Sequence, residues 1–332
     1  MRAPDSDQPT PPDARARLRR PGDALPDASI GTVPILWHHA PPDGSAVVAD
    51  PIAILDEIAR VGYEGTQLDD GLPEGAELRS LLARRDLGLA EVYAALPASP
   101  SGLGQDALAI GRERLRLLVE GAGDILCVAL DGSPDRDARA GRAASDGTPR
   151  LSDAAWAELV DVLHTLADET NLAGRRLAFH PHAGTYIETP AEVERLVTTT
   201  DAQRVGICVD VGHFLVGGGD PVAALERLGD RVTHVHLKDV DPIVLARLSE
   251  GSLSGLGEAV DQRIFTELGA GMLDLMGVLR VLAARAYDGW LMVEQDSSWG
   301  PPSEAAAIGR RVLAHALATL GAESASQMLP TQ

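Results

Sequence analysis

The chain has 332 residues, enough for one large α/β domain or two smaller ones. Its 49 Asp and Glu residues outnumber its 29 Lys and Arg residues, and the net charge of -20 disfavours nucleic acid or an anionic membrane surface as a partner. No apolar run approaches the roughly 18 residues of a membrane span, and the N-terminus lacks the apolar core of an export signal. The two cysteines, Cys127 and Cys208, lie in separate apolar runs, which predicts buried thiols in a reducing cytoplasm.

Residues 1–29 are rich in Pro, Asp, Arg and Ala and show little apolar periodicity, which predicts a flexible tail. The alternative is that this segment covers the bottom of the domain or a neighbouring subunit. Residues 30–321 repeat a short apolar run followed by an amphipathic run, and are expected to form one domain. Residues 322–332 are expected to form a loose C-terminal tail.

The apolar runs predict eight strands, at 31–37, 63–68, 87–94, 124–130, 176–180, 205–210, 232–238 and 289–294. The predicted helices are at 51–61, 74–85, 104–120, 152–169, 189–199, after Asp220, at 275–286 and at 303–320, with 241–274 irregular. Thr189 to Glu192 has the sequence of a capping box with proline at the first helical position.

This alternation requires parallel strands with right-handed crossovers, so we predict a single-domain α/β fold, the (β/α)8 TIM barrel. A doubly wound open sheet is disfavoured because no glycine fingerprint follows the first strand.

The last four strands each end in a side chain that can bind a metal: His180, Asp210, His236 and Glu294. Active sites of such barrels lie at the carboxyl ends of the strands, so these side chains are expected to converge. Two imidazoles and two carboxylates suit Mn²⁺, Co²⁺, Fe²⁺ or Zn²⁺ better than Ca²⁺. The alternative is a polar network that closes the top of the barrel.

Further polar side chains flank this set. His182 is a fifth ligand or an acid–base group, and His213 follows Asp210 closely, although either imidazole could instead satisfy backbone groups. His234, His236 and Lys238 share one strand face. We predict that His236 is the ligand and that His234 lies deeper in the core. Lys238 either holds a substrate oxygen or forms a structural salt bridge.

The sequence His-Pro-His-Ala-Gly-Thr at 180–185 resembles the strand-5 signature of inosose dehydratases. The similarity continues in order and spacing at 188–190, 210–213, 217–221, 234–240, 265–266, 269–271, 287–290 and 294–296. It covers about residues 30–320 and is specific from His180 onward. These enzymes belong to the xylose-isomerase-like barrels, alongside ketose 3-epimerases, hydroxypyruvate isomerases and endonuclease IV-type nucleases.

The resemblance implies a divalent-metal site in which Asp210, His236 and Glu294 match the family's ligands. Many members have Glu where this chain has His180. The N-terminal half departs from the dehydratase pattern. Trp-His-His-Ala at 37–40 replaces Trp-Ser-Asn-Asp, and Gln-Leu-Asp-Asp at 67–70 replaces Glu-Leu-Gly. Both stretches are expected to face the substrate, so the metal chemistry could be shared while the substrate differs.

The implied function is a metal-dependent lyase of inositol catabolism. It would dehydrate 2-keto-myo-inositol (inosose) by α-proton abstraction and β-hydroxyl elimination through a metal-stabilised enediolate. Mn²⁺ or Co²⁺ is the first choice, with Zn²⁺, Fe²⁺ or Mg²⁺ as alternatives. Glu294 is the expected base, and His182 or Lys238 the group that protonates the leaving hydroxyl. The expected substrate contacts are His213, Glu188, Trp37, His39 and Gln67.

The first alternative is a keto-sugar isomerase or epimerase, because the same enolate can be reprotonated. A second alternative is a barrel that binds a sugar or a partner without turnover. A nuclease is disfavoured by the net charge of -20. The expected partner is a small keto-polyol or sugar, and a homo-oligomer is compatible with the sequence.

Overall fold

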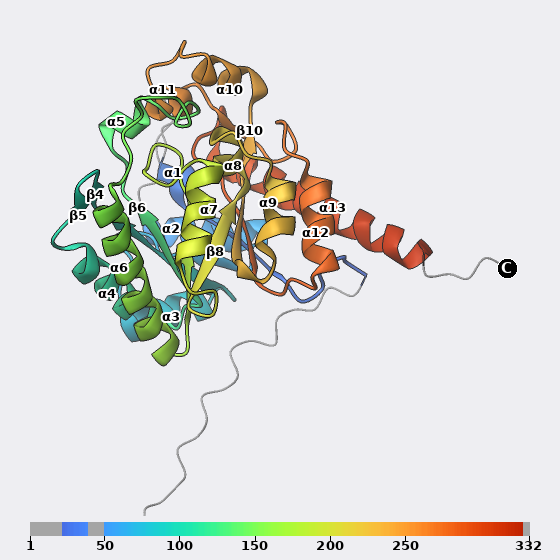
Figure 1. Ribbon diagram of the computed structural model, residues 1–332. Helices are drawn as coiled ribbons and strands as arrows, with labels where there is room; N and C mark the ends of the chain where they lie inside the picture. The colour runs from blue at the N-terminus through green and yellow to red at the C-terminus, as the bar shows by residue number, and fades with distance from the viewer. Residues whose placement is uncertain (1–21, 39–49, 328–332) are drawn as a thin grey trace, which may run out of the picture.

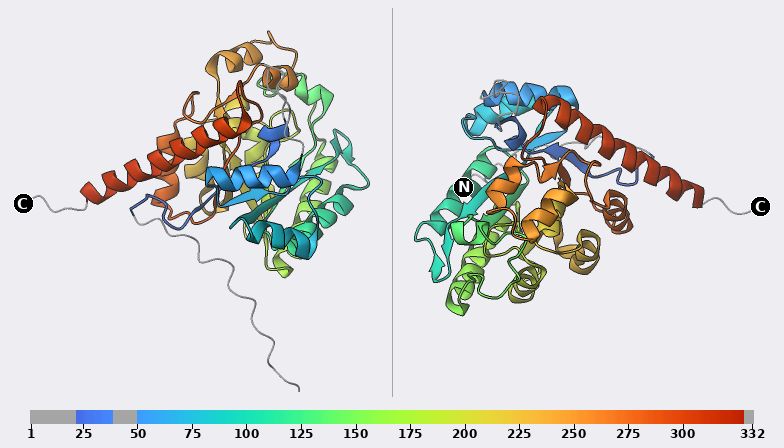
Figure 2. Two further views of the ribbon diagram at one scale, coloured as in Figure 1. Left: turned by 180° about the vertical axis from the view of Figure 1, so that it is seen from behind. Right: turned by 90° about the horizontal axis from the view of Figure 1, so that it is seen from above.

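A closed barrel of parallel strands forms the centre of the molecule (Figures 1 and 2). The computed structural model describes residues 22–38 and 50–327. Within them the strand order is β1-β12-β9-β8-β7-β6-β3-β2, with every neighbouring pair parallel. The strands are β1 (Ser29–Thr32), β2 (Gly65–Gln67), β3 (Gly88–Leu96), β6 (Ile125–Leu130), β7 (Arg176–Phe179), β8 (Val205–Asp210), β9 (Val232–Leu237) and β12 (Trp290–Val293). The predicted (β/α)8 barrel is thereby confirmed.

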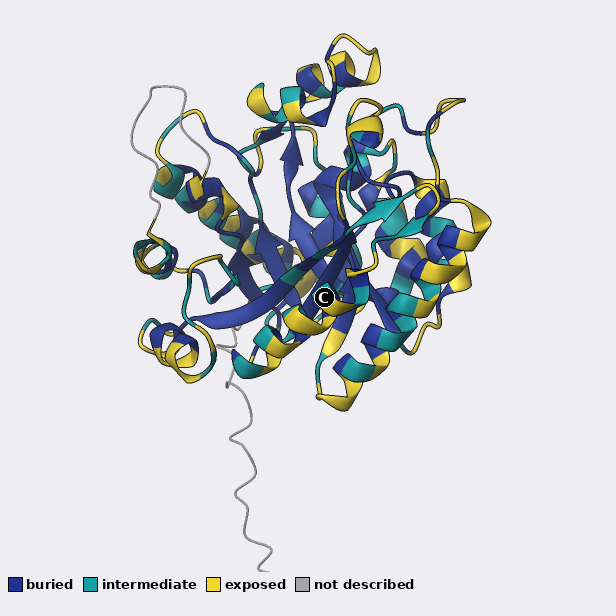
Figure 3. Cartoon of the chain, turned by 90° about the vertical axis from the view of Figure 1, so that its left-hand side faces the viewer, coloured by how far each residue is buried: buried dark blue, intermediate teal, exposed yellow. Residues whose placement is uncertain are grey.

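Amphipathic helices surround the barrel, with exposed residues on their outer faces, while the strands are buried (Figure 3). They are α2 (Pro51–Val61), α3 (Gly75–Ala83), α4 (Ala107–Glu120), α6 (Asp153–Leu172), α7 (Pro190–Thr199), α9 (Pro221–Leu228), α12 (Leu275–Ala284) and α13 (Pro302–Gln327). The largest hydrophobic cluster fills the space between strands and helices, with Leu126, Val209 and Leu291 among its strand residues. No described helix is both long and apolar enough to cross a membrane.

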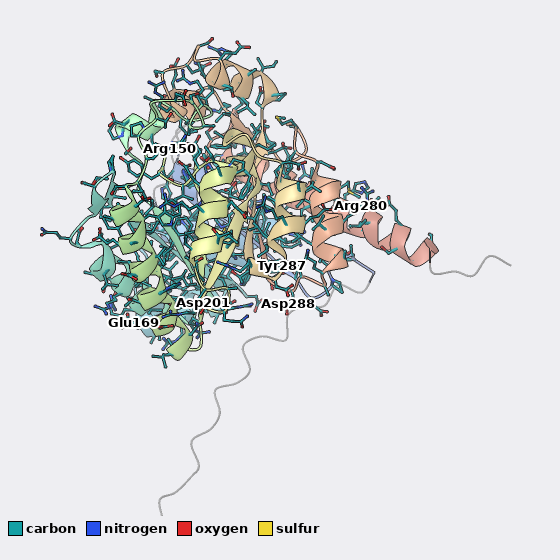
Figure 4. All side chains as sticks on the ribbon, viewed as in Figure 1. Arg150, Glu169, Asp201, Arg280, Tyr287 and Asp288 are labelled. Atoms are coloured by element: carbon teal, nitrogen blue, oxygen red, sulfur yellow. The ribbon has the colours of Figure 1, made fainter. Side chains whose placement is uncertain are left out.

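Short helices and strands lie in the segments that connect the barrel strands and the surrounding helices. These are α1 (Ile35–His38), α5 (Pro134–Asp137), α8 (Val211–Val216), α10 (Pro242–Ser249), α11 (Leu256–Asp261), the 3-10 helix η1 (Gly229–Arg231), and the antiparallel pairs β4 (Ala98–Ser99) with β5 (Gly102–Leu103) and β10 (Asp239–Val240) with β11 (Phe265–Thr266). Helices α10 and α11 lie above one end of the barrel (Figure 1). That end carries the carboxyl termini of the strands. Figure 4 places Arg150, which follows β6, toward it, and Asp201 and Asp288, which precede strands, at the opposite end.

Local sequence fixes several helix starts as predicted. The Thr189 side chain accepts from the backbone of Glu192, and the Glu192 side chain accepts from the backbone of Thr189, which completes the capping box of α7. Asp220 caps α9 in front of a proline. Such caps each stabilise a helix by about 1 kcal/mol, so they define where each crossover begins.

The first strand is shorter than predicted. It ends at Thr32, and Ile35–His38 turns into helix α1, whose first turn is closed by a bond from Trp37 N to Pro34 O (2.9 Å). Proline cannot donate to a strand ladder and is tolerated at a helix start, which explains the early end.

Both chain ends are more ordered than predicted where they are described. Helix α13 continues past Gly321 to Gln327. Residues 22–28 of the expected tail pack on this helix, since Leu25 is buried and Ala24 N donates to Leu317 O (3.2 Å). The remaining parts of the two expected tails, 1–21 and 328–332, lie outside the described residues.

The barrel is plugged at the end where its strands begin. Trp290 and Met292 point inward and are buried together with Val33 and Ala90. A Cβ on Gly65 would lie 2.4 Å from the Trp290 ring, so only glycine leaves room for this plug. In the described part of the chain, the interior is therefore closed at the end where the strands begin.

Candidate metal centre and active site

The four side chains predicted as ligands converge inside the barrel. Asp210 Oδ2 lies 3.5 Å from His180 Nε2 and 3.8 Å from His236 Nδ1, and the latter lies 2.7 Å from Glu294 Oε2. Asp210 and His236 face inward from β8 and β9, and His180 and Glu294 directly follow β7 and β12. The ligand atoms of His180, Asp210 and His236 all lie within 4.8 Å of one another, which is close enough to share one ion.

These atoms are buried, and among the described residues none makes a well-aligned hydrogen bond, although His236 Nδ1 and Glu294 Oε2 lie 2.7 Å apart. This holds for both ring nitrogens of His180, for Asp210 Oδ2, for His236 Nδ1 and for Glu294 Oε2. The other oxygen of Asp210 is used, since Oδ1 accepts from Gly212 N (2.8 Å) and His213 N (2.9 Å) at the start of α8. An unsatisfied buried polar atom costs about 1–3 kcal/mol, so the convergence of these lone pairs fits a divalent cation with two nitrogen and two oxygen ligands.

Lys238 lies beside these residues and is enclosed by acidic groups. Its Nζ is 2.9 Å from Glu294 Oε1, 2.9 Å from Asp296 Oδ1 and 3.6 Å from Asp210 Oδ2. It also sits 4.6 Å from the centre of the Phe265 ring. Burial lowers the pKa of Lys238, but the three carboxylates outweigh it and raise that pKa well above its ordinary value. Lys238 therefore remains a cation in the site.

The same contacts give two neighbouring carboxyl groups different pKa values. Burial raises the pKa of Glu294, but Lys238 and His236 overcome it and lower this pKa to about 2. Burial raises the pKa of Asp296 to about 6, against the attraction of Lys238. Asp296 was not predicted as a site residue, although its position two residues after Glu294 could have drawn attention to it.

His182 and His213 form a stacked pair next to the centre. Their ring centroids are 3.6 Å apart, with the planes tilted by 37°. His182 Nδ1 lies 2.7 Å from Ala183 O, so it donates there and leaves Nε2 as the nitrogen available to a ligand. Burial lowers the pKa of His182 to about 3. The Nε2 atom of His213 accepts from Lys238 Nζ (3.1 Å), so His213 supports Lys238.

A cavity of about 460 Å³, with a mostly apolar lining that includes several polar side chains, lies next to His182. Its lining includes Tyr93, Asp131, Ser133 and Thr185. The edge of the Tyr93 ring faces His180, with 6.0 Å between ring centroids, which links the cavity to the centre. A cavity of this size, mostly apolar with a few polar side chains, has the character of a small-molecule site.

The other predicted substrate contacts lie in different surroundings. Trp37 is buried in the hydrophobic cluster between barrel and helices, and Gln67 is half-buried at the end of β2. Glu188 is buried, and its carboxylate accepts from Gly184 N (2.8 Å) and Gly141 N (3.0 Å). Trp37 thus packs in this cluster and Glu188 supports two loops, and both stay predicted substrate contacts. His39 lies outside the described residues.

Sequence reasoning missed Glu91 on β3. It is fully buried in the barrel, with Oε2 3.0 Å from His234 Nε2 and 3.2 Å from His236 Nε2. Burial raises the pKa of Glu91, but the two imidazoles hold it well below its ordinary value. The only available signal was one carboxylate in an otherwise apolar run. His234 is buried more deeply than His236, as predicted, and both cysteines are buried free thiols.

Comparison with known proteins agrees with the fold. Residues 55–316 match the family model described as xylose isomerase-like TIM barrel. A protein of Geobacillus kaustophilus named inosose dehydratase is 33% identical over 270 residues, covering 80% of this chain and 87% of its own. One of Lacticaseibacillus casei with the same name is 29% identical over 289 residues, covering 86% and 95%.

A solved structure of the IOLI protein with a bound zinc atom superposes with a TM-score of 0.65 at 14% identity, covering 88% of this chain and 98% of that one. At this identity the likeness concerns the fold alone. The family model and the relatives, by contrast, cover most of the barrel and its polar end. The chain belongs to the xylose isomerase-like TIM barrel family.

Proposed function

We propose that the protein is a metal-dependent lyase that removes water from a keto-polyol, with 2-keto-myo-inositol as the first candidate substrate. The observation that carries the proposal is the convergence of ligand atoms from His180, Asp210, His236 and Glu294 near a cavity that His182 lines. The relatives named inosose dehydratase, which align over most of the chain, support an enzyme of the dehydratase type.

The four residues would hold one divalent cation. When bound, the cation supplies Lewis-acid polarisation of a substrate keto oxygen, which acidifies the adjacent C–H bond. Mn²⁺ and Co²⁺ are our first choices, with Zn²⁺, Fe²⁺ and Mg²⁺ as alternatives, because the mixed nitrogen and oxygen donors accommodate all of them to some degree.

Glu294 is the proposed base. Its low pKa keeps the carboxylate ionised, and Lys238 orients one of its oxygens at 2.9 Å. The carboxylate would accept the α-proton while the C–H electron pair forms the enol double bond. Lys238 would also stabilise negative charge that develops on the substrate.

Proton delivery to the leaving hydroxyl falls to one of the two predicted donors, Lys238 or His182. Lys238 carries the proton, but its Nζ is held by Glu294 and Asp296. His182 lines the cavity, but it can donate from Nε2 only when its ring is cationic, because Nδ1 donates to Ala183 O. The electron pair of the enolate would then form the Cα–Cβ double bond as the C–O bond breaks with its own pair on oxygen, and the added proton releases that oxygen as water; the resulting enol tautomerises to the dione. The predicted substrate contacts remain part of this proposal: His213, Glu188, Trp37, His39 and Gln67.

The deciding experiment is turnover of 2-keto-myo-inositol by metal-stripped protein re-supplied with Mn²⁺ or Co²⁺. The dione product is followed by ultraviolet absorbance and NMR. Metal-dependent loss of water is the expected result. If no dione forms but solvent deuterium enters an added keto-sugar, the function is that of an isomerase or epimerase. If neither reaction occurs in the metal-loaded protein, the enzymatic proposal fails.

A further inference from the structure

Glu91 owes its position to a shift in register between β2 and β3. Thr66 pairs with Leu89, but the next residue, Gln67, pairs with Glu91, so Ala90 is an extra residue in β3. Leu89 belongs to the cluster outside the barrel and Ala90 to a cluster inside it. A bulge of this kind re-aims the side chains that follow it. Glu91 therefore faces the interior rather than the helices.

Inside the barrel, Glu91 completes a line of three side chains. His234 Nε2 lies 3.0 Å from one of its oxygens, and His236 Nε2 lies 3.1 and 3.2 Å from its two oxygens. All three residues are at most 2% exposed. The other ring nitrogen of His236, Nδ1, faces the opposite way, toward Glu294 and Asp210. Each nitrogen of the His236 ring thus faces a carboxylate group.

We infer that Glu91 is a positioning residue for the metal centre: by accepting the Nε2 proton of His236, it leaves the Nδ1 lone pair free and aimed at the cation. A neutral imidazole has one protonated nitrogen and one acceptor nitrogen, and only the acceptor can bind a metal. A carboxylate behind the ring selects the required tautomer and fixes the ring orientation. His234 in turn holds Glu91. The inference rests on the proposed metal centre but not on the identity of the substrate.

A purely structural role accounts poorly for Glu91. A carboxylate in a barrel interior must be desolvated, and an apolar side chain of similar volume usually stabilises such a position at least as well. The interior of this barrel is apolar at the level of Trp290 and Met292. Glu91 instead lies where it contacts His236, a proposed ligand. This position is expected if Glu91 orients the ligand rather than stabilises the packing.

The test measures affinity for Mn²⁺ and Co²⁺ by competition with a chromogenic chelator, together with the visible spectrum of the Co²⁺ form. We expect Glu91→Gln to weaken metal binding by about 10–100-fold, as is typical when such an outer carboxylate is lost. Glu91→Leu, which has no acceptor, is expected to weaken binding further while unfolding at a urea concentration no lower than that for Glu91→Gln. If Glu91→Leu binds metal more weakly than Glu91→Gln but is no less stable, Glu91 serves to position the ligand rather than to pack the barrel.

Glu64→Gln is the matched control. Glu64 is a part-buried glutamate that accepts from Ile30 N (2.8 Å) at the plugged end of the barrel, away from the ligands. Its substitution should leave metal affinity and the Co²⁺ spectrum unchanged.

Unchanged affinity and an unchanged Co²⁺ spectrum in folded Glu91→Gln and Glu91→Leu would overturn the inference. So would two bound equivalents of metal, one of them lost in Glu91→Gln, since Glu91 would then be a ligand itself. If the native protein binds no divalent cation, the metal centre and this inference both fail. If it binds one cation but does not dehydrate inosose, the substrate proposal fails and the role of Glu91 stands.

Discussion

Replacing Asp239 by asparagine should strongly destabilise the protein. Asp239 is the first residue of β10, two positions after the end of β9, and is 1% exposed. Its carboxylate accepts four backbone N–H groups: Val240 (2.8 Å) and Leu273 (2.9 Å) at Oδ1, and Gly269 (2.8 Å) and Gly271 (3.1 Å) at Oδ2. These bonds fasten the loop that leads into α12 to β10, directly after Lys238.

The size of the effect follows from counting acceptors. Asparagine retains one oxygen, which can serve two of the four amides, and it turns an NH₂ group toward the other two. Each amide left without an acceptor in a buried position costs about 1–3 kcal/mol. Asp239→Asn should therefore lower the free energy of unfolding by about 2–6 kcal/mol, a large part of the 5–15 kcal/mol typical of a domain.

The assay is urea unfolding followed by circular dichroism, with Asp241→Asn as the matched control. Asp241 lies two residues further along and caps α10, but it uses a single oxygen for Ile243 N (2.8 Å) and Val244 N (3.0 Å). Asparagine caps helices about as well as aspartate, so the control should change stability by less than about 0.5 kcal/mol. Equal and small effects of the two substitutions would refute the reasoning.

Three further predictions concern the site and its loops. Glu294→Gln should lower dehydration about 10³-fold or more, because it removes a ligand and the base together; near-normal turnover in steady-state assays would dismiss that assignment. Saturating Mn²⁺ at about 1,000 times the dissociation constant should stabilise the native protein by about 4 kcal/mol in thermal unfolding, and a stabilisation of the same size in Asp210→Asn would place the ion elsewhere. Burial raises the pKa of Glu188 from 4.5 to about 7, so its contribution to stability is complete below pH 4.5 and is lost as the pH rises through 7. Between pH 5 and pH 8 the free energy of unfolding should thus fall by up to about 3 kcal/mol more in the native protein than in Glu188→Gln. Parallel pH profiles of the two proteins would disprove this.

The barrel and the convergence of its ligands could be predicted because both follow from local periodicity. Parallel strands that alternate with helices bring their carboxyl ends to one edge, so residues as distant as His180 and Glu294 meet without any knowledge of loop structure. The prediction that His234 lies deeper in the barrel than His236 followed from their order along β9. Whether the four residues bind a metal stays a prediction.

The remaining features depend on interactions that periodicity does not encode. Glu91 faces the interior only because of the extra residue Ala90, and a strict alternation counted from Leu89 would have placed Glu91 outside. The role of Glu188 is set by the backbone of Gly141, which is remote in sequence. Cytoplasmic location, homo-oligomerisation and the identity of the metal likewise stay predictions of the sequence.

The plug formed by Trp290 affects how substrate and product enter and leave the barrel. Because the described residues close the barrel where its strands begin, the interior is a dead-end chamber on that side, and a molecule that enters from the other end leaves by the same route. In the proposed reaction the newly formed water is released into a chamber still occupied by the organic product. Departure of that product then governs when the next substrate can enter, so the dione should act as a competitive inhibitor of its own formation.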